Sequence, residues 1–273
     1  MNLRLVFGVL AGLTVGGLSL VADAADEPQG PDDPLLQSVA DSSTRFAAGL
    51  YSRLKAQPGN LTFAPFGLSQ ALMPLAAGAR GTTEAELAKV LQLSVPAVDA
   101  ADGYAMLSRR LQRAAGGEGA LSFAKALWVQ QWNTVNRDFV DLMREHCRSE
   151  LRVIDFSRGK SAAHWMNKWI AERTDDLIPA IADAQTFDES TRLVVGNAVY
   201  FKAGWKSEFD PAQTTARPFH AAAEPAPVDV PTMRQTAPYR LCAQPGFRLL
   251  QLPYRGDRLV MVDHLGRAVD GDQ

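Results

Sequence analysis

Apolar residues recur at helical spacing through much of the first two thirds of the chain, and short alternating runs follow. The stripe formed by Phe46, Leu50 and Leu54 repeats every four residues and predicts an amphipathic helix. Similar patterns predict further helices from Pro65 to about residue 76 and at 83–91, 104–115, 137–148 and 162–172. Pro74 is expected to kink or shorten the helix that contains it, and Thr83–Glu86 is typical of a capping box.

Strand-like runs are concentrated toward the C-terminal end. The patterns predict strands at 61–63, 121–131, 151–156, 193–201, 239–243, 247–252 and 258–262. The last two runs are separated by Arg255-Gly256-Asp257 and are expected to form a hairpin. Because helices dominate first and strands later, the order favours one large α+β domain.

The run Leu193–Phe201 is apolar on both faces, as expected for a central strand covered on both sides. Asn197 interrupts one of these faces with a carboxamide that needs hydrogen-bond partners. It is either a satisfied core residue that ties two elements together or a polar contact in a sheet that opens. Gly204 and Trp205 then end the strand and place a large aromatic ring at its rim.

Several blocks of the chain, in order, resemble the serpin family. The blocks are Asn60–Leu93, Met166–Ile178, Asn197–Trp205, Val230–Arg240 and Leu250–Val262. The resemblance extends from about Ser38 to Val262 and implies a partial serpin domain over 38–262. The implied fold is α+β, with helices packed around a large mixed β-sheet plus smaller sheets, incomplete at the C-terminus.

The resemblance implies an inhibitor of serine, and in some cases cysteine, proteases. Serpins expose a reactive loop that the protease cleaves, and the loop then inserts as a new strand into the main sheet. In the family this loop follows all the blocks found here, so no reactive-loop residue is expected among the 273 positions. We therefore expect that these residues alone are not inhibitory.

Four positions are singled out by the resemblance. Asn197 matches the family's residue at the sheet opening, and Trp205 matches its strand-rim tryptophan. Ala64 and Gly67 stand where the family usually carries serines that join the same polar cluster. Ala64 is also a weaker helix cap than serine, by about 1 kcal/mol.

The first residues have the features of an export signal. Met1–Arg4 is basic, an apolar run follows, and Ala22-Asp23-Ala24 offers a cleavage site, so residues 1–24 are interpreted as a signal peptide. The acidic, Pro-containing stretch at 25–37 is expected to be a disordered leader. Residues 263–273 are expected to be an unstructured tail. The mature protein is then secreted and extracellular.

Charge and motifs argue against other functional classes. The net charge of −2 gives no attraction to nucleic acid or anionic membrane. The four histidines show no metal-ligand spacing, so no metal, cofactor or catalytic residue is assigned. Gly159-Lys160-Ser161 fails as a phosphate loop because Ile154 replaces the required glycine. A secreted binding protein or hydrolase on a serpin-like scaffold is the alternative, and it requires a Ser or Cys beside a histidine.

Three further expectations concern the cysteines and His146, a cluster of arginines, and one strand edge. Cys147 and Cys242 are predicted to be buried free thiols, and His146 a satisfied core residue. Arg109, Arg110 and Arg113 share a helix face that either binds a polyanion or simply aids solubility. The strand at 193–201 is expected to have an open edge that promotes self-association by strand addition.

Overall fold

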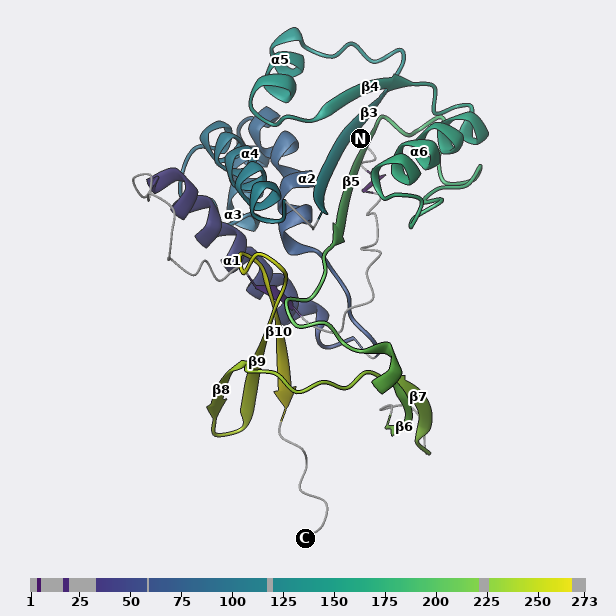
Figure 1. Ribbon diagram of the computed structural model, residues 1–273. Helices are drawn as coiled ribbons and strands as arrows, with labels where there is room; N and C mark the ends of the chain where they lie inside the picture. The colour runs from purple at the N-terminus through teal and green to yellow at the C-terminus, as the bar shows by residue number, and fades with distance from the viewer. Residues whose placement is uncertain are drawn as a thin grey trace. The chain divides into compact units, whose positions relative to one another are not determined.

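The computed structural model describes residues 4–5, 17–19, 33–57, 59–116, 120–220 and 226–266. The chain divides into two compact units, which are described separately. The first holds six helices and one sheet of those described, and the second holds the remaining strands (Figure 1). The helix and strand content confirms the α+β class predicted from the pattern.

The first unit contains a four-stranded sheet in the order β1-β5-β3-β4. Its strands are β1 (Arg4–Leu5), β3 (Ala120–Gln130), β4 (Glu150–Ile154) and β5 (Leu193–Lys202). The helices are α1 (Pro34–Leu54), α2 (Pro65–Gly78), α3 (Thr82–Val90), α4 (Ala97–Ala114), α5 (Arg137–Glu145) and α6 (Gly159–Arg173). Strand β3 pairs with β4 in parallel, and β1 pairs with β5 in parallel.

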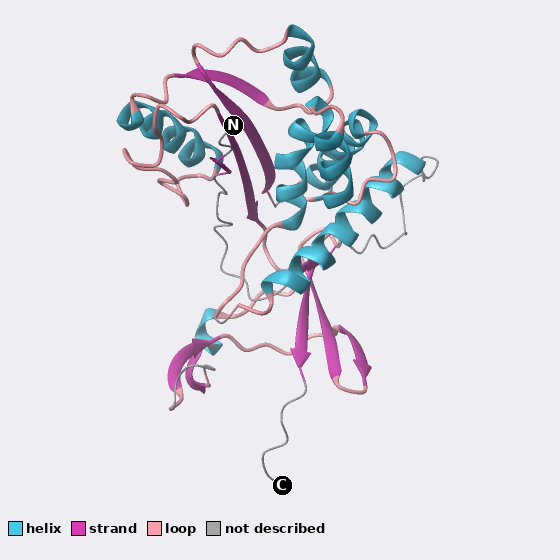
Figure 2. Ribbon diagram, turned by 180° about the vertical axis from the view of Figure 1, so that it is seen from behind, coloured by secondary structure: helices cyan, strands magenta, loops and turns pink. Residues whose placement is uncertain are grey.

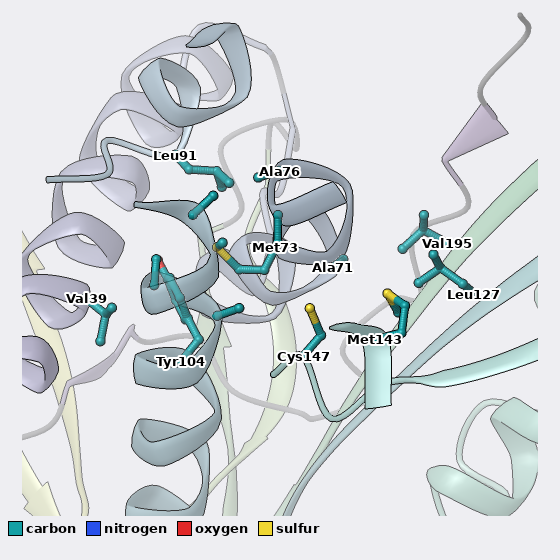
Figure 3. Packing of buried hydrophobic residues seen from close by; sticks show 14 of the residues in the cluster. Val39, Ala71, Met73, Ala76, Leu91, Tyr104, Leu127, Met143, Cys147 and Val195 are labelled. Atoms are coloured by element: carbon teal, nitrogen blue, oxygen red, sulfur yellow. The ribbon is translucent and has the colours of Figure 1, made fainter. Parts of the chain in front are cut away.

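Both faces of this sheet are covered within the first unit. Helices α1 to α4 lie on one side of β3 and β5, and α6 lies on the other (Figures 1 and 2). Val195 of β5 packs in the cluster on the α1–α4 side, shown in Figure 3, whereas Val194 and Ala198 pack in the α6 cluster. This alternation confirms that β5 is apolar on both faces, as its sequence indicated.

Glycine allows β3 and α6 to approach β5 closely. A Cβ at Gly196 would lie 2.4 Å from the Trp128 ring, which packs edge-on against Trp169 at 5.0 Å between ring centroids. Both indoles are almost fully buried. The one glycine in this strand is therefore needed to seat the aromatic pair against the sheet.

Glu150, the first residue of β4, anchors α6 to the sheet. Its carboxylate accepts hydrogen bonds from Arg173 at 2.6 Å and from the Trp169 indole at 3.3 Å, both on α6. Arg152 of β4 donates two more, at 2.9 and 2.6 Å. Three residues from two elements thus donate four hydrogen bonds to a single carboxylate.

The second unit contains an antiparallel sheet in the order β2-β10-β9-β8 and a separate β6–β7 pair. The strands are β2 (Gly17–Ser19), β6 (Thr215–Phe219), β7 (Val228–Thr232), β8 (Arg240–Gln244), β9 (Phe247–Pro253) and β10 (Val260–Gly266). A short 3₁₀ turn, η1, spans Pro211–Gln213. The antiparallel β9–β10 pairing confirms the predicted hairpin.

The structure corrects two predicted boundaries. Helix α1 begins at Pro34 because Asp33 caps it, accepting a hydrogen bond from the Leu35 N–H at 2.9 Å. Residues 34–37 are therefore helical and not part of a disordered leader. Strand β10 reaches Gly266 because it pairs with β9 as far as Phe247, so residues 263–266 are not an unstructured tail. The rest of the predicted leader, tail and signal peptide lies outside the described residues, except Asp33, β1 and β2.

The structure also differs from several other local predictions. Residues 61–63 form no strand, and α3 is capped at Gly81, whose φ is +67°, without the predicted side-chain box. Helix α2 continues through Pro74 to Gly78, so Pro74 does not end it. Strands β6 and β7 were not expected, because Pro218 and Pro231 interrupt their sequence pattern.

Candidate functional site

The candidate site of the first unit is the seam where α2 crosses β5. Asn197 of β5 is 8% exposed, and its Nδ2 donates to the Ala124 carbonyl of β3 at 3.3 Å. The carboxamide therefore links β5 to β3, in the way that a core asparagine ties two elements together. Among the described residues its Oδ1 receives no hydrogen bond, so half of the amide is available to another donor.

Gly67 of α2 faces this oxygen directly. A Cβ at Gly67 would lie 2.6 Å from Asn197 Oδ1 and 2.9 Å from Val199 Cγ2. Such distances are well inside van der Waals contact, so the seam in its present form excludes any side chain at position 67. The structure thus brings Gly67 and Asn197 together, and the space that a serine would occupy is filled by the amide.

Ala64 occupies the N-cap position of α2. It makes no side-chain capping bond, and Pro65 follows at the first helical position. The Ala64 carbonyl accepts the Leu68 N–H at 3.0 Å, which is the ordinary first helical bond. The helix start therefore depends on Pro65 and on backbone bonding, as the sequence indicated.

Trp205 belongs to the second unit and is held by the loop between β9 and β10. Its ring stacks on Tyr254, with 4.6 Å between centroids and 12° between planes, and the two residues form a β-bridge. Next to them, the Arg255 N–H donates to the Gly204 carbonyl at 2.9 Å, and Lys206 pairs with Asp257 at 2.6 Å. Tyr254 was not singled out from the sequence, because only the stacking reveals its role.

The histidines and cysteines do not assemble a nucleophilic site in the described part of the chain. His146 is not a core residue: it is partly exposed and forms a hydrogen bond from Nδ1 to Asp102 at 2.8 Å. No described histidine forms a hydrogen bond with a serine or cysteine side chain. The hydrolase alternative therefore lacks the contact that it requires.

The two cysteines differ in environment. Cys147 is buried as predicted, and burial raises the pKa of its thiol to about 11, so the thiolate is scarce at neutral pH. Nearby, Lys125 donates to the Cys147 carbonyl at 2.7 Å. The prediction was wrong for Cys242, which is exposed because β8 is the outermost strand of its sheet. Both thiols are free.

The remaining candidates lie on the surface. Arg109, Arg110 and Arg113 are all exposed on α4, and none forms an ion pair within the described residues. In the same part of the chain, no group of three or more acidic, histidine or cysteine residues could hold a metal ion. Nor does any described helix have the length and hydropathy to cross a membrane.

Comparison with known proteins places these observations in context. A family model described as serpin (serine protease inhibitor) matches residues 41–271, a range that ends nine residues after Val262, the last residue of the resembling blocks. The chain is 33% identical to an uncharacterized serpin-like protein of Thermococcus kodakarensis over 86% of its own length and 53% of the relative's. It is 31% identical to alaserpin of Manduca sexta, covering 87% of the chain and 60% of the relative. Human neuroserpin is 27% identical, with 85% and 61% covered.

Solved structures give the same result for the fold. A cleaved serpin 42Da superimposes with a TM-score of 0.76 at 26% identity, covering 85% of this chain and 61% of that one. Reactive-loop-cleaved human thyroxine-binding globulin superimposes with a TM-score of 0.77 at 24% identity, covering 85% and 69%. The chain thus spans about 53 to 61% of the length of these three curated relatives.

Proposed function

Because the chain belongs to the serpin family, we propose that it provides the sheet framework of a secreted inhibitor of serine, and in some cases cysteine, proteases. We also propose that the 273 residues by themselves do not trap a protease. Trapping in this family needs a cleaved loop to insert as a strand beside the one that matches β5. The resemblance places that loop in the part of the relatives that this chain does not span.

The arrangement of β5 carries the proposal. On one side β5 has β3 as its neighbour, and on the other its partner among the described residues is β1, at Val194 and Val195. From Gly196 to Tyr200 the described residues therefore place no strand on that side. A strand added there would obtain main-chain hydrogen bonds from a well-packed template.

Incubation with trypsin, chymotrypsin, elastase and papain tests the proposal. We expect no SDS-stable complex and no loss of protease activity, because the resemblance places the bait loop outside these 273 residues. An intact inhibitory serpin serves as the positive control. A covalent band at the summed mass of protease and this chain would disprove the proposal, because a bait loop would then exist among these residues.

Secretion is proposed from the N-terminal pattern alone. Expression with export should yield a mature protein that begins at Ala25, directly after the predicted cleavage site. Intact mass spectrometry of the exported protein measures this. A mass that retains residues 1–24 would contradict it.

A further inference from the structure

A cavity of about 480 Å³ lies in the first unit, where the end of α2, the end of β3, the start of α5 and the start of β5 meet. Its volume falls in the range of small-molecule sites in proteins. No residue of the seam at Asn197 lines it. The cavity is therefore a separate feature from the candidate site.

Two arginines line this cavity, and local backbone groups hold each of them in place. Arg80 donates from Nη1 to the carbonyls of Ala77, in the last turn of α2, at 3.1 Å and of Ala79, its C-cap, at 2.6 Å. Arg192 donates from Nη1 to the carbonyls of Glu189 and Thr191. Each guanidinium keeps its Nη2 and Nε donors, and among the described residues neither forms an ion pair with a carboxylate.

The wall between the arginines is apolar and closely packed. Phe139 and Leu142 of α5 and Val129 of β3 contribute to it. A Cβ at Gly78 would lie 2.4 Å from the Phe139 ring, so α2 ends directly against α5. The Gln130 N–H donates to the Arg192 carbonyl at 3.0 Å and fixes the start of β5 beside the end of β3. The two arginines thus lie in the short segments directly after α2 and directly before β5.

The charge balance favours an anion. Among the described residues that line the cavity, Asp138, in the first turn of α5, is the one carboxylate, and two guanidinium groups stand beside it. Asp138 lies near the N-terminal, positive end of the α5 dipole, where a carboxylate is stabilised. The Asn136 side chain caps this helix by accepting the Asp138 N–H at 2.9 Å. The lining therefore carries one net positive charge at neutral pH, with preorganised donors beside an aromatic wall.

We propose that this cavity binds small organic anions that combine one carboxylate or phosphate with an apolar ring. The anion lies against the guanidinium donors of Arg80 and Arg192, because forked charge-assisted hydrogen bonds suit these acceptors. The ring packs against Phe139 and Leu142. This site is independent of protease trapping and does not depend on the proposed function.

Titration of the full chain with benzoate tests the proposal, with phenyl phosphate as a second anion and benzamide and benzamidine as neutral and cationic analogues. Calorimetry and ligand-observed NMR measure the affinity. We expect both anions to bind, benzamide to bind at least about tenfold more weakly, and benzamidine not to bind. Failure of both anions to bind would overturn the proposal, as would equal binding of benzamide.

Single variants locate the site. Arg80→Ala and Arg192→Ala should each weaken benzoate binding by about tenfold or more. Arg144→Ala is the matched control, because Arg144 is exposed on the same helix as Phe139, pairs with Asp141 and does not line the cavity. If Arg192→Ala lowers the melting temperature, Arg192→Lys is measured in its place. Lysine keeps the positive charge but lacks the paired N–H donors of the guanidinium group, so benzoate binding should still weaken. An affinity unchanged in Arg80→Ala and Arg192→Lys would refute the assignment.

Discussion

At the residue scale, Gly67 decides how closely α2 approaches β5. Its absent side chain leaves room for Asn197 Oδ1, which a Cβ would meet at 2.6 Å. The family usually has serine at this position, so the resemblance alone suggests a lost hydroxyl. The structure indicates instead that Asn197 has taken the hydroxyl's space and bonds the neighbouring strand.

Gly67→Ala is therefore expected to destabilise the protein by about 1–2 kcal/mol. Overpacking lowers the free energy of unfolding by about 1–3 kcal/mol, whereas the higher helix propensity of alanine raises it by up to about 1 kcal/mol. Urea unfolding measures the change in free energy. Gly49→Ala is the matched control: Gly49 lies in α1 with nothing within 4 Å of its Cβ position, so this change should stabilise the protein slightly.

A double-mutant cycle attributes the cost to Asn197. In an Asn197→Ala background the clash with Oδ1 disappears, so Gly67→Ala should cost less than in the original chain. Equal costs in both backgrounds would show that Val199 or the backbone, and not the amide, sets the distance.

At the scale of elements, Glu150 joins β4 to α6. Burial acts to raise the pKa of this carboxyl, but the hydrogen bonds from Arg152, Arg173 and Trp169 outweigh it, and the pKa lies below its usual range. A carboxyl whose pKa is depressed in the folded state stabilises the fold above its unfolded-state pKa. That stability is lost as the pH falls through the folded-state pKa.

Glu150→Gln should therefore lower the unfolding free energy by about 1 kcal/mol at pH 7, since the carboxylate is about one third exposed and partly screened. The difference between variant and original should shrink below about pH 4. Urea midpoints across pH measure it. Glu172→Gln, which removes an exposed 3.9 Å pair with Lys168 on the same helix, should change little at any pH. A difference that is constant from pH 7 to pH 3 would show that the charge of Glu150 does not contribute.

At the scale of the whole molecule, both larger sheets have an edge covered by the N-terminal segment. Arg4–Leu5 pairs with Val194–Val195 of β5, and Gly17–Ser19 pairs with Val260–Val262 of β10. Both covering strands lie within the predicted signal peptide. Cleavage after Ala24 would remove them and leave two apolar strand edges without these partners.

A chain that starts at Ala25 is thus expected to self-associate by strand addition or to unfold partly, and to do so more than the chain of 273 residues. Size-exclusion chromatography with light scattering and thermal melting compares the two. A sharp monomer peak and a cooperative transition for the shorter chain would show that the edges need no cover.

The sequence by itself determined the elements and the family. Helical spacing in α1 and α6 and apolar faces in β5 are local patterns, because side-chain direction follows from the backbone repeat of each element. The serpin-like blocks likewise depend only on residue order. Strands β6 and β7 were not predicted for the same local reason, because Pro218 and Pro231 interrupt the sequence pattern of a strand.

Only the tertiary structure decided which residues meet. Gly67 and Asn197 are 130 positions apart, and Trp205 and Tyr254 stack across 49. The arginines of the cavity, Arg80 and Arg192, likewise come from distant segments. Contacts between distant segments depend on how whole elements pack, and no local period encodes that packing. The exposure of Cys242 follows in the same way from the position of β8 at the edge of its sheet.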